Sequence, residues 1–132
     1  MKDKLDIYVD VTGNETGQRF EGKFVVKTKI SNREALKEDE VRRNILGQNP
    51  QHAGEYAWGI ASMIAWLAVR LTDSPTWWKE AGGGVDLLDD NVLTTVHDKA
   101  VKAVTDEKAA FLEAAEKAKA DLAARATADD VK

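Results

Sequence analysis

The side chains that most often carry acid–base or metal chemistry are few in this sequence. It contains two histidines, His52 and His97, and no cysteine. Neither histidine has a second histidine at metal-ligand spacing. His97 is followed directly by Asp98, and adjacent residues on a helix point their side chains apart. These patterns disfavour a metal site or an acid–base pair built on either histidine.

A group of aspartates follows a run of glycines. Asp86, Asp89 and Asp90 come shortly after the glycines at 82–84. An EF-hand calcium loop needs oxygens at alternate positions and a glutamate at the twelfth, which this spacing lacks. We therefore interpret the aspartates as caps of the following helix. The glycines lack the Lys-Ser/Thr of a phosphate loop, and the carboxylates would repel an anion, so a hinge is favoured.

No serine lies in a nucleophile-elbow context, although Ser, His and Asp are all present. The sequence therefore predicts a protein that is not an enzyme, with no catalytic, cofactor-binding or metal-binding residue. A small metal-binding or enzymatic domain is kept as the least favoured alternative. It would need a pocket that gathers His52 or His97 with carboxylates.

The tryptophans are candidates for protein contact, because Trp is enriched at interface hot spots. Trp77 and Trp78 are adjacent on a short predicted helix, so their side chains point about 100° apart. Either both clamp that helix onto the core, or one of them anchors an interface. Trp58 and Trp66 lie in the most apolar segment of the chain. We therefore include all four tryptophans among the candidates for contact with a partner protein.

Arg42 and Arg43 form a mild basic patch with Arg33, Lys37 and the lysines of the second strand, while acidic residues gather at 86–90 and in the tail. Such charge separation favours head-to-tail assembly. The alternative is a solvated helix face with glutamates interspersed. With the arginines included, the candidate interface residues are Trp58, Trp66, Trp77, Trp78, Arg42 and Arg43.

The 132 residues carry a formal net charge of −4, which argues against nucleic acid as a partner. The first residues show no apolar signal core, and no stretch reaches the roughly eighteen apolar residues of a membrane span. We expect no membrane association, no cofactor and a cytoplasmic location.

The sequence predicts an α+β fold in which an N-terminal antiparallel β-hairpin packs on a bundle of three main helices plus one short helix. Strict alternation predicts the hairpin at residues 4–30, with a turn between Gly13 and Gly17. Ser31 and Glu34 form a capping box that starts the first helix. The apolar stripe of this helix, which is expected to face inward, comprises Ala35, Leu36, Val41, Ile45 and Leu46.

The expected helices span residues 32–46, 55–71, 75–80 and 90–125, within one domain at 1–125 and before a flexible tail at 126–132. Ser74 and Pro75 are read as the cap and first residue of the short helix. The segment 55–71 is apolar on nearly all sides and must be buried on nearly all sides. Either the rest of the domain wraps it, or part of it is an interface. The last helix is expected to pack through its first half and to project or fray beyond Glu113.

One block of the sequence carries a family resemblance. Residues 69–93 read VRLTDSPTWWKEAGGGVDLLDDNVL, with the moderately specific pattern Pro-x-Trp-Trp followed by Asp-Leu-x-Asp-x-Asn-Val. Residues 20–28 and 41–47 add to the similarity, which covers about residues 20–104. This chain resembles small proteins from the structural gene clusters of tailed bacteriophages, above all those called tail assembly chaperones.

The resemblance implies a role in virion morphogenesis, by non-covalent binding to a tail tube or tape-measure protein in the host cytoplasm. It carries over no catalytic residue. The alternative is a structural protein that stays in the virion, as a head decoration or a head–tail or tail connector protein, with the capsid among its partners. A homo-oligomer is left open in either case.

Overall fold

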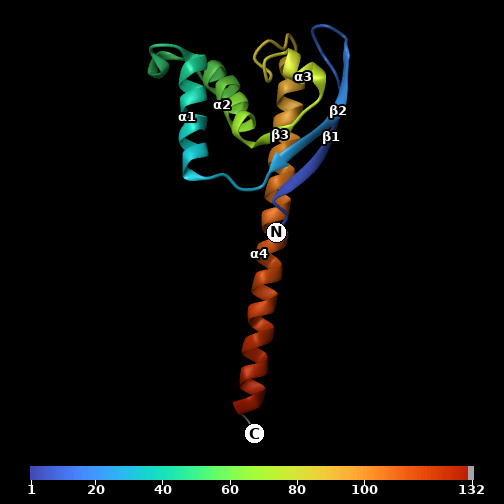
Figure 1. The fold of residues 1–132 in the computed structure, drawn as a ribbon, viewed down its shortest axis with the longest axis vertical. Coiled ribbons are helices and arrows are strands. Elements are labelled where there is room, and N and C mark those ends of the chain that lie inside the picture. Colours follow the sequence, from blue (N-terminus) through green and yellow to red (C-terminus); the bar gives the residue numbers. More distant parts are fainter. Residues whose placement is uncertain (131–132) are drawn as a thin grey trace.

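The computed structural model describes residues 1–130 (Figure 1). These residues form an α+β fold, as predicted, with one three-stranded antiparallel sheet in the order β1-β2-β3. A 3₁₀ turn at Pro50–His52 lies between the first two helices. The elements are β1 (Lys4–Thr12), β2 (Arg19–Lys27), α1 (Asn32–Leu46), α2 (Glu55–Arg70), β3 (Leu71–Asp73), α3 (Thr76–Glu80) and α4 (Asp90–Asp130).

The hairpin pairs as its alternation predicts. Ile7 lies opposite Phe24, and Val11 lies opposite Phe20. The alternating apolar side chains face the core, where Phe24 and Val26 are completely buried. The turn between the strands closes through a hydrogen bond from the Gly17 N–H to the Gly13 carbonyl.

The third strand is absent from the sequence prediction, which extended the second helix to Leu71. The helix ends at Arg70, and the next three residues turn back to pair with β2. Val26 lies opposite Leu71 and Val25 opposite Asp73, with a register shift between them. Three residues are too few to display the alternation that reveals a strand.

The last helix is anchored by side chains between Val92 and Val104 and projects beyond them. Its buried residues are Val92, Leu93, Val96, Ala100 and Val104. From Thr105 to Thr127 every side chain except the half-buried Glu107 is exposed. Figure 1 shows this part of α4 extending away from the other elements. A projecting end agrees with expectation, but the projection begins at Thr105, before the predicted Glu113, and the helix continues to Asp130 instead of ending at 125. The predicted tail is thus helical to that residue, and residues 131–132 lie outside the described part of the chain.

The first helix corrects part of the predicted inward stripe. α1 packs against α2, and α2 against α4. No residue of α1 is fully buried, and Leu36 of the stripe is 72% exposed, while Val41 and Leu46 are half-buried. The side that meets α2 also carries Glu38 and Arg42, because these side chains find polar partners there. The capping box of Ser31 and Glu34 is present as predicted.

The short helix also begins differently from the prediction. Pro75 is the N-cap residue of α3, with extended backbone angles, and no side chain caps the helix. Ser74 is therefore one residue too early to be the cap. Its N–H instead bonds the Asp73 carboxylate.

Candidate protein-binding surface

The adjacent tryptophans fasten α3 to the sheet. Trp78 is 3% exposed and meets Phe24 edge-on, with ring centroids 5.4 Å apart. Trp77 is half-buried, packs on Phe20, and donates its indole N–H to the Glu21 carbonyl at 2.9 Å. Trp78 is thus a core residue and cannot supply the surface contact predicted for it. For Trp77, an interface role stays a prediction.

The other two tryptophans lie on α2, and an arginine guanidinium packs over each of their rings. The Arg70 guanidinium lies 4.4 Å from the centre of the Trp66 ring. The Arg42 guanidinium lies 5.9 Å from the Trp58 ring, whose N–H bonds the Pro50 carbonyl. Both rings are half-buried, so interface roles for Trp58 and Trp66 stay predictions.

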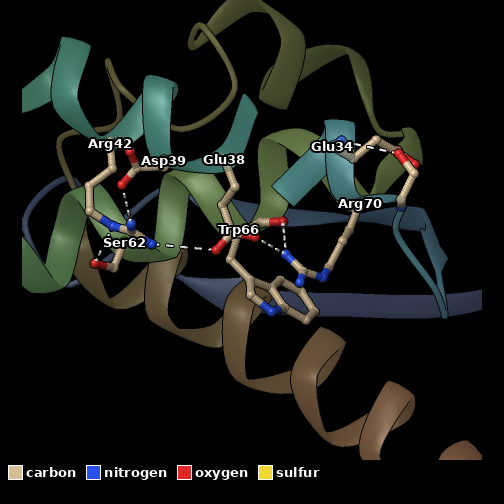
Figure 2. Close-up of polar contacts among 8 residues, drawn as sticks. Glu34, Glu38, Asp39, Arg42, Ser62, Trp66 and Arg70 are labelled. Carbon is tan, nitrogen blue, oxygen red and sulfur yellow. Dashed lines mark hydrogen bonds and ion pairs between the residues drawn. The ribbon is translucent and has the colours of Figure 1, made fainter. Parts of the chain in front are cut away.

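A polar network joins α1 to α2 (Figure 2). Glu38 accepts a hydrogen bond from Arg70 at 2.6 Å, and both side chains are 17% exposed. Arg42 donates to the Ser62 hydroxyl at 3.0 Å and lies 3.4 Å from both Glu38 and Asp39. Polar pairing therefore contributes much of the contact between these helices.

The same network pairs two arginines of the predicted basic patch with carboxylates. Arg42 faces Glu38 and Asp39, and Arg43 lies 2.9 Å from the other Asp39 oxygen. Arg43 is exposed, and its expected role in an interface stays a prediction. Because each arginine has a carboxylate beside it, this face of α1 offers little net positive charge.

A hollow of the surface opens between the end of α1, the first half of α2 and the loop before α4. It has a volume of about 930 Å³. Several of its apolar side chains are unusually open to solvent: Tyr56 is 71%, Val85 53% and Leu88 77% exposed. Ile60 and Leu93 form its deeper lining.

A second cavity of about 730 Å³ adjoins the first, and the two share Ile45 and Val85. It runs between α1, α2 and the glycine turn, with Leu67 and Trp78 in its lining. The two hollows together form one surface feature, here called the apolar groove and defined by Ile45, Tyr56, Ile60, Val85 and Leu88. Exposed apolar area of this kind marks sites of protein or ligand contact.

The loop wall of the groove is fixed by Asp89. This carboxylate is completely buried and accepts hydrogen bonds from the N–H groups of Glu15 and Thr16 and from the Thr16 hydroxyl, at 2.6, 2.9 and 2.8 Å. Burial acts to raise its pKa, but these hydrogen bonds outweigh burial and hold the pKa below the usual 3.8. Asp89 thus ties the hairpin turn to the start of α4, where the sequence suggested a helix cap.

The glycines beside the groove form a tight turn. Gly82, Gly83 and Gly84 all have positive φ angles, which side chains other than glycine rarely adopt. A Cβ atom at Gly84 would lie 2.8 Å from the Trp78 ring. This run therefore packs against the core, where the sequence favoured a hinge.

Among the groups considered for metal or acid–base chemistry, His97 and Asp98 meet: the His97 Nδ1 lies 3.2 Å from a carboxylate oxygen of Asp98. This corrects the expectation that these adjacent side chains point apart. In the part of the chain that the structure describes, no group of three or more His, Asp or Glu side chains is placed to hold a metal ion. His52 is exposed in the 3₁₀ turn, while His97 packs edge-on against Trp66. None of the helices within residues 1–130 is long and apolar enough to cross a membrane.

Sequence reasoning missed the groove as a site. Tyr56 lies in the first turn of a strongly apolar helix, where it resembles a core residue in sequence. Val85 and Leu88 lie in an acidic loop. Apolar residues in such a loop were the sequence signal that could have indicated the groove.

The fold and its surface define a small α+β protein with an open apolar groove. No protein-family model, curated protein or solved structure matches the chain. The groove and the resemblance noted in the sequence are therefore what bears on function.

Proposed function

We propose that this chain is a binding protein of tailed-phage morphogenesis, acting as a tail assembly chaperone that holds a tail protein non-covalently in the host cytoplasm. The observation that carries the binding part is the apolar groove, with Tyr56, Val85 and Leu88 open to solvent. Grooves of this kind take apolar side chains from one face of a partner segment. The assignment to phage tails comes from the Pro-x-Trp-Trp block at residues 75–78 and the motif that follows it.

The proposed mechanism needs no chemistry on the bound protein. The groove covers apolar side chains that would otherwise associate prematurely, and it releases them when the tail polymerises. The contact surface in this proposal is the groove, with Trp58 as a neighbour on α2. The buried Trp78 supports it from beneath, since Trp78 also lines the second cavity.

The test is co-expression with the tail tube and tape-measure proteins of a phage that encodes this chain. The proposal expects one of them to co-purify with the chain, and Leu88→Asp to abolish this because a carboxylate would be buried against apolar groups. Leu36→Asp is the matched control: Leu36 is 72% exposed against 77% for Leu88, and it lines neither cavity. If both variants lose co-purification equally, or if neither loses it, the groove is not the contact surface.

A second candidate is a structural component that stays in the virion. The observation that favours it is the projecting part of α4, where Phe111, Leu112 and Leu122 are 47%, 62% and 65% exposed. A neighbouring subunit in a particle would cover such a helix. Mass spectrometry of purified mature virions separates the candidates, since a chaperone is absent from them and a structural protein is present.

A further inference from the structure

We infer that the groove takes an amphipathic helix whose apolar face is flanked by lysine or arginine. This inference rests on the proposed function, because it names the partner class of the same surface. The first observation is that the groove is large and has two parts. Two adjoining hollows of about 930 and 730 Å³ provide room for several large side chains in succession. Apolar side chains at i, i+3, i+4 and i+7 of a helix offer such a row.

The charge of the groove selects the partner. Among the described residues, Glu15 and Asp90 line the larger hollow, and no lysine or arginine does. The second hollow has Lys79 as its charged lining residue, and this ammonium lies 3.5 Å from the Asp73 carboxylate. Neither Glu15 nor Asp90 forms an ion pair within residues 1–130. The Tyr56 hydroxyl donates to Asp90 at 3.2 Å, which leaves the charge of that carboxylate uncompensated. An apolar floor with a negative rim complements an apolar helix face with positive flanks.

The same charges argue against the chain's own projecting helix as the occupant. Phe111, Ala115, Ala118 and Leu122 of α4 have the right spacing for a groove-binding face. Residues 105–130, however, carry seven carboxylates against four lysine or arginine side chains. Placing this acidic helix from a second copy against Glu15 and Asp90 would set like charges together. The acidic rim therefore favours a foreign basic helix over self-association.

The experiment uses two synthetic helical peptides with the full chain. Both carry leucines at positions i, i+3, i+4 and i+7; one has lysines on the flanks of that face and the other has glutamates. Fluorescence anisotropy measures their affinities. We expect the lysine peptide to bind at least tenfold more tightly, and its affinity to fall as salt is raised.

Three variants locate the effect. The double change Glu15→Gln and Asp90→Asn should remove most of the preference for the lysine peptide. The double change Glu113→Gln and Glu116→Gln on the projecting helix alters the net charge equally and should keep the preference. Leu88→Asp should weaken binding of the lysine peptide although it adds negative charge, which separates docking in the groove from general attraction to an acidic protein.

Each other outcome overturns the inference in a recognisable way. Equal affinity for both peptides contradicts the charge selection and leaves the groove as a binding site. A preference for the glutamate peptide points to an acidic helix such as α4 of a second copy. Binding of neither peptide, while a tail protein is still captured through Leu88, removes the helix inference alone. Binding of neither, with capture of a tail protein that Leu88→Asp does not change, removes the groove as the contact surface. Binding of neither, with no tail protein captured by the parent chain, removes the proposed function as well.

Discussion

The two walls of the apolar groove are held in place by different kinds of interaction. The wall formed by α3, the glycine turn and the start of α4 rests on buried apolar and aromatic side chains, with Trp78 against Phe24. The buried carboxylate of Asp89 fixes its far end. The wall formed by α1 has no buried residue and is attached to α2 by the Glu38–Arg70 and Arg42–Ser62 contacts.

This difference indicates which wall adapts to a partner. Apolar burial is close-packed and tolerates little displacement. Polar contacts at a half-exposed surface add only a modest net stability each, so segments held by them open locally at low cost. We expect α1 to be the adjustable wall and α3–α4 to be the rigid one.

The largest effect is expected from a change in the rigid wall. Phe24→Ala removes a completely buried ring that contacts both Trp77 and Trp78. The free energy of unfolding should fall by about 3–5 kcal/mol, as is typical of such truncations. Urea denaturation followed by tryptophan fluorescence measures this fall. A loss no larger than that of an α1 surface variant would break the distinction between the walls.

A smaller effect is expected where α1 meets α2. Glu38→Ala leaves Arg70 and Arg42 without their shared carboxylate, and should cost about 1.5–3 kcal/mol. Hydrogen exchange should show faster opening of α1 and unchanged protection of α4. Glu40→Ala is the control, because Glu40 forms only an exposed pair with Lys37 at 3.6 Å and should cost under about 1 kcal/mol. Faster exchange spread over the whole fold would show that the walls do not respond separately.

Acid should loosen the adjustable wall at its N-terminal end. The Lys27 ammonium and the Ser31 N–H bond Glu34 and hold the pKa of this carboxyl below its usual 4.5. The folded state therefore gains stability from ionised Glu34 above pH 4.5, and loses it as the pH falls through the lower folded pKa. Urea midpoints across this range should decline less steeply for Glu34→Gln than for the parent chain. Identical slopes would contradict a role for Glu34 in acid stability.

The N-cap of the same helix offers a test at neutral pH. Ser31 accepts a hydrogen bond from the Glu34 N–H at 3.1 Å. Ser31→Ala should lower the free energy of unfolding by about 1 kcal/mol. Ser31→Asp keeps an oxygen at the cap and should restore most of this stability. Ser31→Asn is a second capping variant. If neither Ser31→Asp nor Ser31→Asn restored the lost stability, the capping hydrogen bond would not contribute to the stability of α1.

The smallest effect on stability is expected in the groove itself. Leu88 is 77% exposed, so Leu88→Asp should change the free energy of unfolding by less than about 0.5 kcal/mol. Thermal melting at equal concentration compares this variant with the parent chain. A large loss of stability would mean that Leu88 supports the loop, and binding data from this variant would then lose their meaning.

The parts of the fold that sequence alone predicted are those with local signals. The alternation around Ile7 and Phe24 placed the hairpin, and the Ser31–Glu34 capping box placed the start of α1. Both patterns depend on residues close together in the chain, so the printed sequence contains them in full.

The parts that sequence did not predict depend on contacts between distant segments. Asp89 accepts hydrogen bonds from Glu15 and Thr16, which lie 74 and 73 positions earlier in the chain. No local pattern indicates such contacts. Glu38 and Arg42 took the inner side of α1 because Arg70 and Ser62 on another helix provide partners. The groove is likewise a product of three separate elements, so the exposure of Leu88 could not be derived from its neighbours in sequence.

Site-specific cross-linking tests the groove as a binding surface most directly. The chain contains no cysteine, so Leu88→Cys and Leu36→Cys each introduce a single thiol for a photo-activated cross-linker. With the tail tube and tape-measure proteins co-expressed, the account predicts that one of them is captured from position 88, while position 36 captures neither. Equal capture from both positions, or capture from position 36 alone, would contradict the assignment of the groove as the binding surface.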